Sequence, residues 1–273
     1  MEEVRSLISK PFAINDNVFT VFAENGNDEK FTSATLYVPK GTKSLYQQTD
    51  RRKNFQNIVE MGDGPEPGKK VERRTVVEEG TGTWCGYCPR GMAFMKKAEN
   101  TYGDRFIGIA IHGDDPMDIG GNGVSFTGFP TCFIDRTGGA QGIGLDVSIV
   151  GDALAVPTDI DVTVTGTWNA DRTQVTATST IEFLSAKQGC IVVYALTADG
   201  LRHSSWKQSN YYSGATSYAN DPYMKPYTEA PNPITDIEFN HVLVASSYSG
   251  STNLASPFSG STAPATSSRT AIR

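Results

Sequence analysis

Residues 75–89 read TVVEEGTGTWCGYCP, and this stretch joins a strand pattern to a helix pattern. Its β-branched beginning predicts a strand, and the glycines and threonines that follow predict a turn. Residues 92–98 then place apolar side chains on one face of a predicted helix. Pro89 fits the first turn of that helix, where a missing N–H costs little. The sequence therefore places Cys85 and Cys88 where a strand turns into a helix.

This position favours redox chemistry at the cysteine pair. A thiol at a helix N-terminus faces unpaired backbone N–H groups and the positive end of the helix dipole, and both stabilise its thiolate. In such motifs the pKa of a cysteine falls from about 8.5 to as low as about 3.5–7.5. Two intervening residues place the second sulfur one turn along, close enough to attack a mixed disulfide on the first. We predict that Cys85 is the nucleophile and Cys88 the resolving thiol, a mechanism that requires no metal or organic cofactor.

Two other interpretations of a C-x-x-C pair stay open. A structural zinc site needs two more ligands, commonly a second close pair. Cys132 and Cys190 are isolated, however, and His112, His203 and His241 are scattered along the chain. The spacing therefore favours redox chemistry over zinc. A permanently closed, inert disulfide is the other alternative.

A second landmark follows about 40 residues later. Residues 106–111, FIGIAI, predict a buried strand of a parallel sheet, and residues 128–135 read GFPTCFID. Proline at the start of a strand is unusual and indicates a special backbone, for which a cis bond before Pro130 is the candidate. We expect Cys132 to point into the core as a small apolar residue, with a role as a third redox partner as the alternative.

The W-C-x-x-C motif at a strand-to-helix junction, followed by G-F-P-T, resembles the thioredoxin superfamily. The resemblance implies an α/β domain in which a cis Pro130, with Phe129 beside it, positions a substrate chain next to the cysteines. It implies that Trp84 shields the sulfurs from one side. It also implies that Glu79, six residues before the first cysteine, is a buried acid that moves protons to or from the resolving thiol. Glu78 should point to the opposite side of the strand, and we expect it to be solvated.

Residues 73–245, about two thirds of the chain, more narrowly resemble the outer membrane protein 28-related family of Bacteroides-type bacteria. That family couples a thioredoxin-like domain to a C-terminal β-sandwich, and the resemblance implies the cell envelope, either the periplasm or the outer-membrane surface. The sequence itself also predicts an antiparallel β-sandwich after residue 156. Its four β-rich runs are 159–168, 173–183, 190–196 and 237–245. We expect this sandwich to be incomplete, because a Ser/Thr-rich tail that forms no core element follows it.

The first 61 residues predict a small separate unit. Residues 34–38 indicate a strand, and residues 43–61 an amphipathic capping helix. The phrase TLYVPKGTKSLYQ resembles the last repeat and cap of BspA-type leucine-rich-repeat surface proteins. One repeat cannot bury its apolar face alone, so we expect further repeats upstream. The alternative is a small α/β extension packed on the next domain, and the opening residues lack the basic start and apolar stretch of an export signal.

Composition excludes several classes of protein. A length of 273 residues predicts about two domains. The net charge of −6 without a basic block disfavours binding to nucleic acid, and no apolar run approaches the roughly 20 residues of a membrane-spanning helix. Glycine and proline between residues 62 and 72 indicate a linker. The expected units are a leucine-rich-repeat-like cap (1–61), a linker (62–72), a thioredoxin-like domain (73–156), a β-sandwich (157–247) and a tail (248–273).

These patterns predict a thiol–disulfide oxidoreductase that acts on protein or peptide disulfides, with a surface partner at the β-sandwich as a further expectation. The alternative function is a cell-surface binding or adhesion protein whose thioredoxin-like unit is a non-catalytic spacer. His112, Asp114 and Asp115 follow a predicted strand and either reach the cysteines or form an ordinary turn. Six aromatic residues between 206 and 227 predict a surface loop over the sandwich, with a peptide- or glycan-contacting surface as the alternative.

Overall fold

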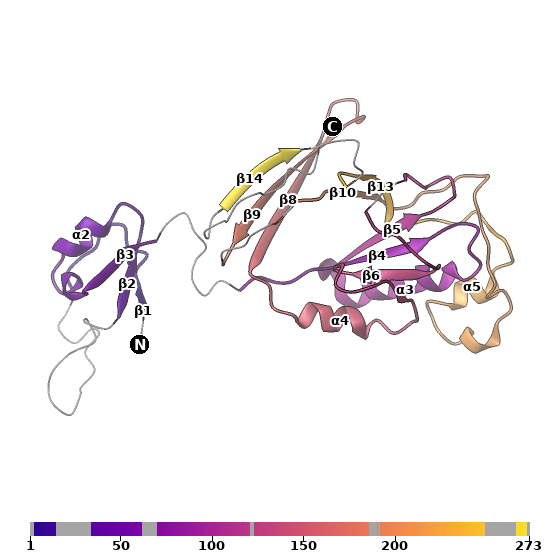
Figure 1. Cartoon of the computed structure of the whole chain (residues 1–273), viewed down its shortest axis with the longest axis horizontal. Helices are drawn as coiled ribbons and strands as arrows, with labels where there is room; N and C mark the ends of the chain where they lie inside the picture. The colour runs from indigo at the N-terminus through magenta and orange to yellow at the C-terminus, as the bar shows by residue number, and fades with distance from the viewer. Residues whose placement is uncertain are drawn as a thin grey trace.

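A six-stranded mixed sheet carries the cysteine pair in this computed structural model, which describes residues 3–14, 34–61, 70–120, 123–185, 190, 192–248 and 266–271 (Figure 1). Within the sheet, β5 pairs in parallel with both β4 and β13, whereas β6 runs antiparallel to β4. The strand order is β10-β13-β5-β4-β6-β7, with the respective bounds Ala195–Ala198, Val242–Ser246, Phe106–His112, Thr75–Thr81, Thr131–Ile134 and Gln141–Gly142. The fold is therefore mixed α/β around this sheet.

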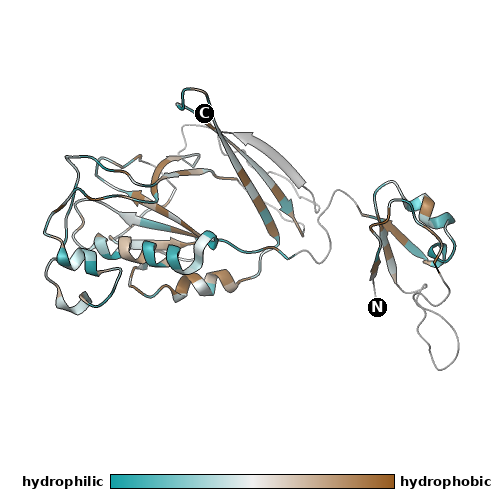
Figure 2. Ribbon diagram, turned by 180° about the vertical axis from the view of Figure 1, so that it is seen from behind, coloured by the Kyte–Doolittle hydropathy of each residue, from teal (hydrophilic) through white to brown (hydrophobic). Residues whose placement is uncertain are grey.

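Two helices, α3 (Cys88–Tyr102) and α4 (Ser148–Ala155), cover one face of the sheet. Hydrophilic and hydrophobic residues alternate as bands along α3 in Figure 2, as in a helix with one exposed face. The core beneath the helices joins both of them to β4 and β6, and includes Val77, Phe94, Met95, Ala98, Cys132, Ile134, Val150 and Leu154. Among the described residues, no helix has the length and apolar character needed to cross a membrane.

The chain between β10 and β13 returns to α3. Its elements are β11 (Lys207–Gln208), a 3-10 helix (Thr216–Tyr218), α5 (Lys225–Glu229) and β12 (Ile234–Thr235). Tyr212 and Met224 from this segment form a buried cluster with Ala93 of α3, against which Tyr218, Tyr223 and Tyr227 also pack. The expectation that this aromatic segment lies over a β-sandwich was therefore wrong, because four of its tyrosines belong to the cluster that packs on α3.

The four β-rich runs do not form one sandwich. The first two give a hairpin of β8 (Ile160–Trp168) and β9 (Val175–Phe183), which belongs to a separate three-stranded sheet of order β14-β9-β8. The other two runs supply β10 and β13 to the central sheet. The expected sandwich of four runs was wrong because an alternating pattern indicates a strand with one buried face, but not the sheet to which that strand belongs.

The Ser/Thr-rich tail also contributes a strand. Within residues 248–273, β14 (Thr266–Ala271) runs antiparallel to β9, with Thr266 opposite Glu182 and Ala271 opposite Ala177. Threonine is a strong strand former, so a polar segment can pair at the edge of a sheet without joining a core. Residues 249–265 and most of the expected linker, residues 62–69, lie outside the described part of the chain.

The N-terminal unit is a small parallel sheet with one short helix. Its strands β1 (Glu3–Arg5), β2 (Thr35–Val38) and β3 (Asn57–Glu60) lie in that order, and α2 (Lys43–Gln48) connects β2 to β3 through a 3-10 helix (Arg52–Asn54). The helix expected over residues 43–61 was wrong after residue 48. Buried Ile58 beside exposed Val59 alternates as in a strand, and Ile58 joins Leu36, Val38 and Tyr46 in the core of this unit.

Candidate functional site

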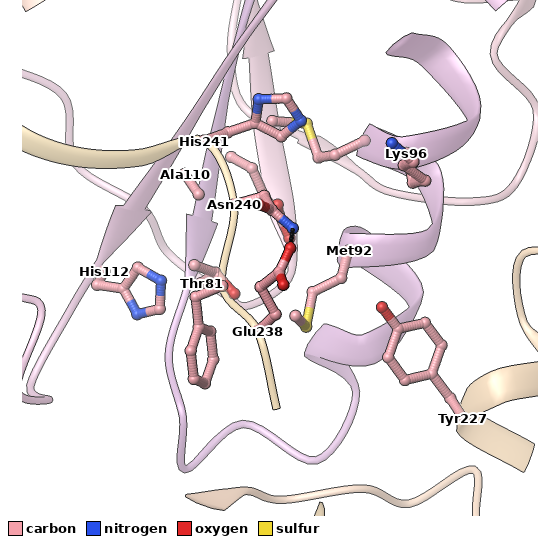
Figure 3. Close-up of a pocket in the computed structure, with 12 residues that line it drawn as sticks. Thr81, Met92, Lys96, Ala110, His112, Tyr227, Glu238, Asn240 and His241 are labelled. Carbon is pink, nitrogen blue, oxygen red and sulfur yellow. Dashed lines mark hydrogen bonds between the residues drawn. The ribbon is translucent and has the colours of Figure 1, made fainter. Parts of the chain in front are cut away.

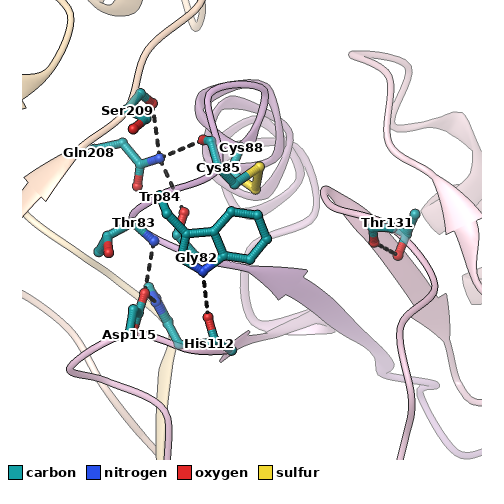
Figure 4. The surroundings of a disulfide bond; sticks show 12 residues. Gly82, Thr83, Trp84, Cys85, Cys88, His112, Asp115, Thr131, Gln208 and Ser209 are labelled. Carbon is teal, nitrogen blue, oxygen red and sulfur yellow. Dashed lines mark hydrogen bonds and ion pairs between the residues drawn. A yellow bond between two sulfur atoms is a disulfide. The ribbon is translucent and has the colours of Figure 1, made fainter.

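A disulfide joins Cys85 to Cys88 where β4 leads into α3 (Figure 4). Two backbone hydrogen bonds close the turn, from Cys85 N–H to Gly82 O (3.0 Å) and from Cys88 N–H to Cys85 O (3.2 Å). Cys88 is the first residue of α3 and is fully buried, whereas Cys85 precedes the helix and keeps 5% of its surface exposed. Of the two, Cys85 is therefore the more accessible cysteine.

Trp84 lies exposed immediately before the first cysteine. Its indole N–H donates to Gly113 O at 2.8 Å, and its ring packs edge-to-face on Phe129 with the ring centroids 5.3 Å apart. We call Trp84 and Phe129 the first aromatic wall. The predicted positioning residues Trp84 and Phe129 are thus brought together, although they are more than 40 positions apart in the chain.

Pro130 lies between this wall and the helix. The Phe129–Pro130 peptide bond is cis, which confirms the backbone expected from the sequence, and Pro130 is buried just before β6. The Thr131 hydroxyl donates to Gly128 O at 2.7 Å and closes the loop. A Cβ at Gly91 of α3 would lie 3.0 Å from Pro130 Cβ. The proline therefore packs against α3 about one turn after the second cysteine.

Gly91 lies where α3 contacts both Glu79 and Pro130. A Cβ at this position would overlap Glu79 Oε1 as well as approach Pro130. Alanine in a helix normally stabilises by about 0.5–1 kcal/mol relative to glycine. Here we expect Gly91→Ala to destabilise the oxidised protein by about 1–3 kcal/mol, since the added methyl group overpacks a buried contact. Urea unfolding measures the change.

The matched control is Gly139→Ala, at a loop position where an added Cβ meets nothing within 4 Å. We expect it to change the free energy of unfolding by less than about 0.5 kcal/mol. Equal effects of the two substitutions would contradict the close contact at α3.

Glu79 lies on β4 opposite Cys132 of β6, and it is only 1% exposed. Within the described residues, its Oε1 atom has no hydrogen-bond partner. Burial raises the pKa of Glu79 from its usual 4.5 to about 8, because the carboxylate would lose its hydration. The carboxyl group is therefore mostly protonated at neutral pH. The structure places this residue at the buried position that the resemblance implies, and its role in proton transfer stays a prediction.

Glu79 belongs to the lining of a pocket of about 110 Å³. Figure 3 labels nine of the other residues that line it. Its polar lining includes Lys96 of α3, Tyr227 of α5, and Glu238 and His241 from the chain before β13. Burial, with the nearby charge of Glu79, raises the pKa of Tyr227. The side chains of Lys96 and Glu238 are 61% and 42% exposed, so the pocket joins the buried carboxyl group to groups at the surface.

Glu78, the residue before Glu79, is buried by an ion pair that the sequence did not indicate. It faces the opposite side of β4, as alternation requires, but its side chain is only 8% exposed. The guanidinium of Arg136 covers it and donates two hydrogen bonds of 2.6 Å to its two oxygens. The expectation of a solvated Glu78 was therefore wrong, because a bidentate ion pair occupies this face of the strand.

His112 and Asp115 hold the turn that leads to the cysteines. His112 Nδ1 lies 2.6 Å from Asp115 Oδ2, and that same oxygen accepts the Thr83 N–H at 2.8 Å. Burial opposes ionisation of Asp115, but the hydrogen bond and charge of His112, together with the backbone N–H groups of Thr83 and Met117, outweigh burial and lower the pKa of this carboxyl group. Asp114 is exposed and belongs to a neighbouring turn. The pair therefore positions the backbone of the turn beside Trp84.

Gln208 contacts the cysteine turn and was not predicted from the sequence. It lies on β11, is 1% exposed, and its amide Nε2 donates to Cys85 O at 2.8 Å and to Gly82 O at 3.3 Å. These bonds hold the carbonyl groups of the cysteine turn from a segment more than 120 positions away (Figure 4). A single glutamine in a polar stretch carries no local signal of this contact. The tyrosines that follow Gln208 were the one feature of the sequence that indicated a packed segment here.

The two remaining described cysteines, Cys132 and Cys190, form no disulfide. Cys132 is fully buried in the core, as expected, and burial together with the charge of Glu79 raises its pKa to about 11. Cys190 is half-buried and lies in no helix or strand, so its expected place at the start of a strand was wrong. In the part of the chain that the structure describes, no three His, Cys, Asp or Glu side chains are grouped as metal ligands.

The fold and the site together define a mixed α/β protein with a disulfide-bonded cysteine pair at a strand-to-helix junction. Comparison with protein-family models and with curated proteins gave no match. Among solved structures, HBP35 of Porphyromonas gingivalis is similar to this chain, with 17% sequence identity and a TM-score of 0.49. The similarity covers 73% of this chain and 63% of that chain, so it spans less than two thirds of the neighbour's length.

Proposed function

We propose that the protein is a thioredoxin-like thiol–disulfide oxidoreductase, with Cys85 as the nucleophile and Cys88 as the resolving thiol. The observation that carries this proposal is a bonded cysteine pair at the start of α3 in which Cys85 alone keeps exposed surface. The cis Pro130 and the first aromatic wall lie close to that turn and position the substrate chain in this proposal.

The reaction needs only sulfur chemistry. In the reduced protein, the Cys85 thiolate attacks one sulfur of a substrate disulfide, and the other substrate sulfur leaves as a thiolate. The Cys88 thiolate then attacks Cys85 Sγ, releases the second substrate thiolate and closes the Cys85–Cys88 bond. Two electrons pass from the protein to the substrate, whose thiolates take up the two protons that the protein thiols release. The same steps run in reverse when a substrate dithiol reduces the protein.

Glu79 is the proposed proton acceptor for the resolving thiol. It contacts α3 at Gly91, about one turn after Cys88. With a pKa of about 8, about a tenth of the Glu79 carboxyl groups are ionised at pH 7, and this ionised form is the one that accepts the proton. The pocket beside Glu79 then offers a path to solvent near Lys96 and Glu238.

We propose that the thioredoxin-like domain extends beyond residue 156, because β10 and β13 belong to the same sheet as β4. The β8–β9 hairpin is then an excursion from that domain. For the N-terminal unit, a leucine-rich-repeat-like cap is supported by the parallel pairing of Thr35 with Asn57. Their separation of 22 residues (57 − 35) falls within the roughly 20–29 residues of such repeats. A place in the cell envelope is inferred from the family resemblance.

Alkylation of the reduced protein tests the proposed nucleophile. We expect Cys85 to react with iodoacetamide with an apparent pKa below about 8.5, since the start of α3 stabilises its thiolate. Mass spectrometry of the labelled peptides across pH 5–9 measures the rate at each cysteine. Cys132 is the internal control and should react slowest, because burial raises its pKa to about 11. An apparent pKa of free cysteine at Cys85 would refute the proposed activation.

The second candidate function is a cell-surface binding protein in which the disulfide unit is a spacer. One observation favours it: the outer strand β8 leaves Val162, Val164 and Trp168 45%, 58% and 54% exposed. The three residues are separated by even numbers of positions, so their side chains share one face of the strand, and exposed apolar patches are typical of interaction sites. The two functions differ in whether Cys85 exchanges with partner proteins.

A further inference from the structure

A second aromatic pair lies on the residues between the two cysteines. The Tyr211 ring covers Gly86 so closely that a Cβ at Gly86 would lie 2.5 Å from Tyr211 Cγ. Tyr87 packs edge-to-face on Tyr211, with the ring centroids 5.1 Å apart. Both residues are more than half exposed, at 54% for Tyr87 and 62% for Tyr211. We call Tyr87 and Tyr211 the second aromatic wall.

Backbone hydrogen bonds fix this wall to the cysteine turn. The Tyr211 N–H donates to Gly86 O at 2.9 Å, and the Ser209 N–H donates to Thr83 O at 2.8 Å. The buried Gln208 adds its bond to Cys85 O from the same segment. Tyr211 therefore cannot move away from the turn without breaking several contacts, so its ring is a preorganised part of the surface that a substrate meets.

The side chains of both walls are uncharged. Trp84, Phe129, Tyr87 and Tyr211 present aromatic rings, whereas the acidic side chain of Glu79 is buried beneath the turn. Exposed tyrosine and tryptophan are typical of sites that bind polypeptide, since they combine a large apolar area with a polar group.

We propose that the second aromatic wall selects polypeptide substrates that carry an aromatic or large apolar side chain next to the reacting cysteine. This inference rests on the proposed function, because it names the substrate class of the same disulfide. The reaction is the exchange described above, with the Cys85 thiolate attacking the disulfide of the bound polypeptide. One added aromatic contact is worth about a 2- to 10-fold gain in rate.

Two synthetic peptides test the selection. They are identical except that the residue next to their single cysteine is tyrosine in one and serine in the other, and each is supplied as its disulfide-linked dimer. The rate of reduction by the reduced full chain is measured for both peptides and divided by the rate with dithiothreitol, which removes their intrinsic reactivity. We expect the native protein to favour the tyrosine peptide by about 2- to 10-fold.

Tyr211→Ala should bring this ratio close to one, whereas Tyr211→Phe, which keeps the ring, should retain it. Phe12→Ala is the matched control, because Phe12 is a similarly exposed aromatic residue (61%) of the N-terminal unit and has no place in either candidate site. Tyr87→Ala removes the other half of the wall and leaves the backbone hydrogen bonds of Ser209 and Tyr211 to the turn in place, so it supplies the same measurement if Tyr211→Ala does not fold. An unchanged ratio in both alanine variants overturns the selection while leaving the proposed function in place. Failure of the native protein to reduce either peptide overturns both.

Discussion

Replacing Cys88 with serine should leave the protein covalently joined to its substrates. In this variant Cys85 still attacks a substrate disulfide, but no second thiol releases the product. We expect reduced Cys88→Ser protein, mixed with an unfolded disulfide-containing protein, to accumulate a mixed disulfide that dithiothreitol cleaves. Cys85→Ser removes the nucleophile, so it should form no adduct and lose on the order of 10³-fold or more in turnover. Non-reducing electrophoresis and mass spectrometry measure both results.

The control for this pair is Cys190→Ser, at a half-buried cysteine outside every helix and strand. It should reduce the same substrate at the native rate. The experiment also separates the two candidate functions. A spacer whose disulfide is inert gives no adduct with Cys88→Ser, and that result would leave the binding function as the better conclusion.

The buried carboxyl group of Glu79 should make stability fall as the pH rises. Its pKa is about 8 in the folded protein and about 4.5 when exposed, so the folded state holds its proton more tightly. The full stability is present below about pH 4.5 and is lost as the pH rises through about 8. Between pH 5.5 and 8.5 we expect the oxidised protein to lose about 3 kcal/mol from this group. Glu79→Gln should remove most of that dependence.

Urea unfolding of both proteins at several values of pH measures this effect. Glu229→Gln is the control, since the Glu229 side chain is 67% exposed and its replacement should leave the native pH dependence unchanged. In the reduced state, Glu79→Gln should also slow closure of the Cys85–Cys88 bond, because the proposed proton acceptor is gone. Equal pH dependence in Glu79→Gln and the native protein would contradict a raised pKa at this site.

The cysteine turn could be predicted because its signals are local in the sequence. A β-branched run, a glycine-rich turn and Pro89 in the first helical turn together determine that a strand leads into a helix at Cys88. The cis bond before Pro130 is indicated by a proline at the start of a strand. In each case neighbouring residues limit the backbone to few conformations.

The surroundings of the turn could not be predicted, because packing between distant segments determines them. An alternating run such as that of β13 fits a separate sheet as well as the central one, and only the finished fold places Val242 beside Ala110. Gln208 reaches Cys85 across more than 120 residues, and Arg136 reaches Glu78 across 58. Residue types and spacing carry no information on such partners when a single sequence is read.

During biosynthesis, the cysteines are made well before the later segments that pack around them. Cys85 leaves the ribosome 123 residues before Gln208 (208 − 85), the residue that holds its carbonyl group. At about 5–20 residues per second, the nascent chain carries its unprotected cysteines for roughly 6–25 s before that partner exists. One edge of β5 stays unpaired for longer, because its partner β13 is synthesised after Gln208. Throughout this interval both thiols are open to oxidants and to folding catalysts, whereas in the folded molecule Cys88 is fully buried.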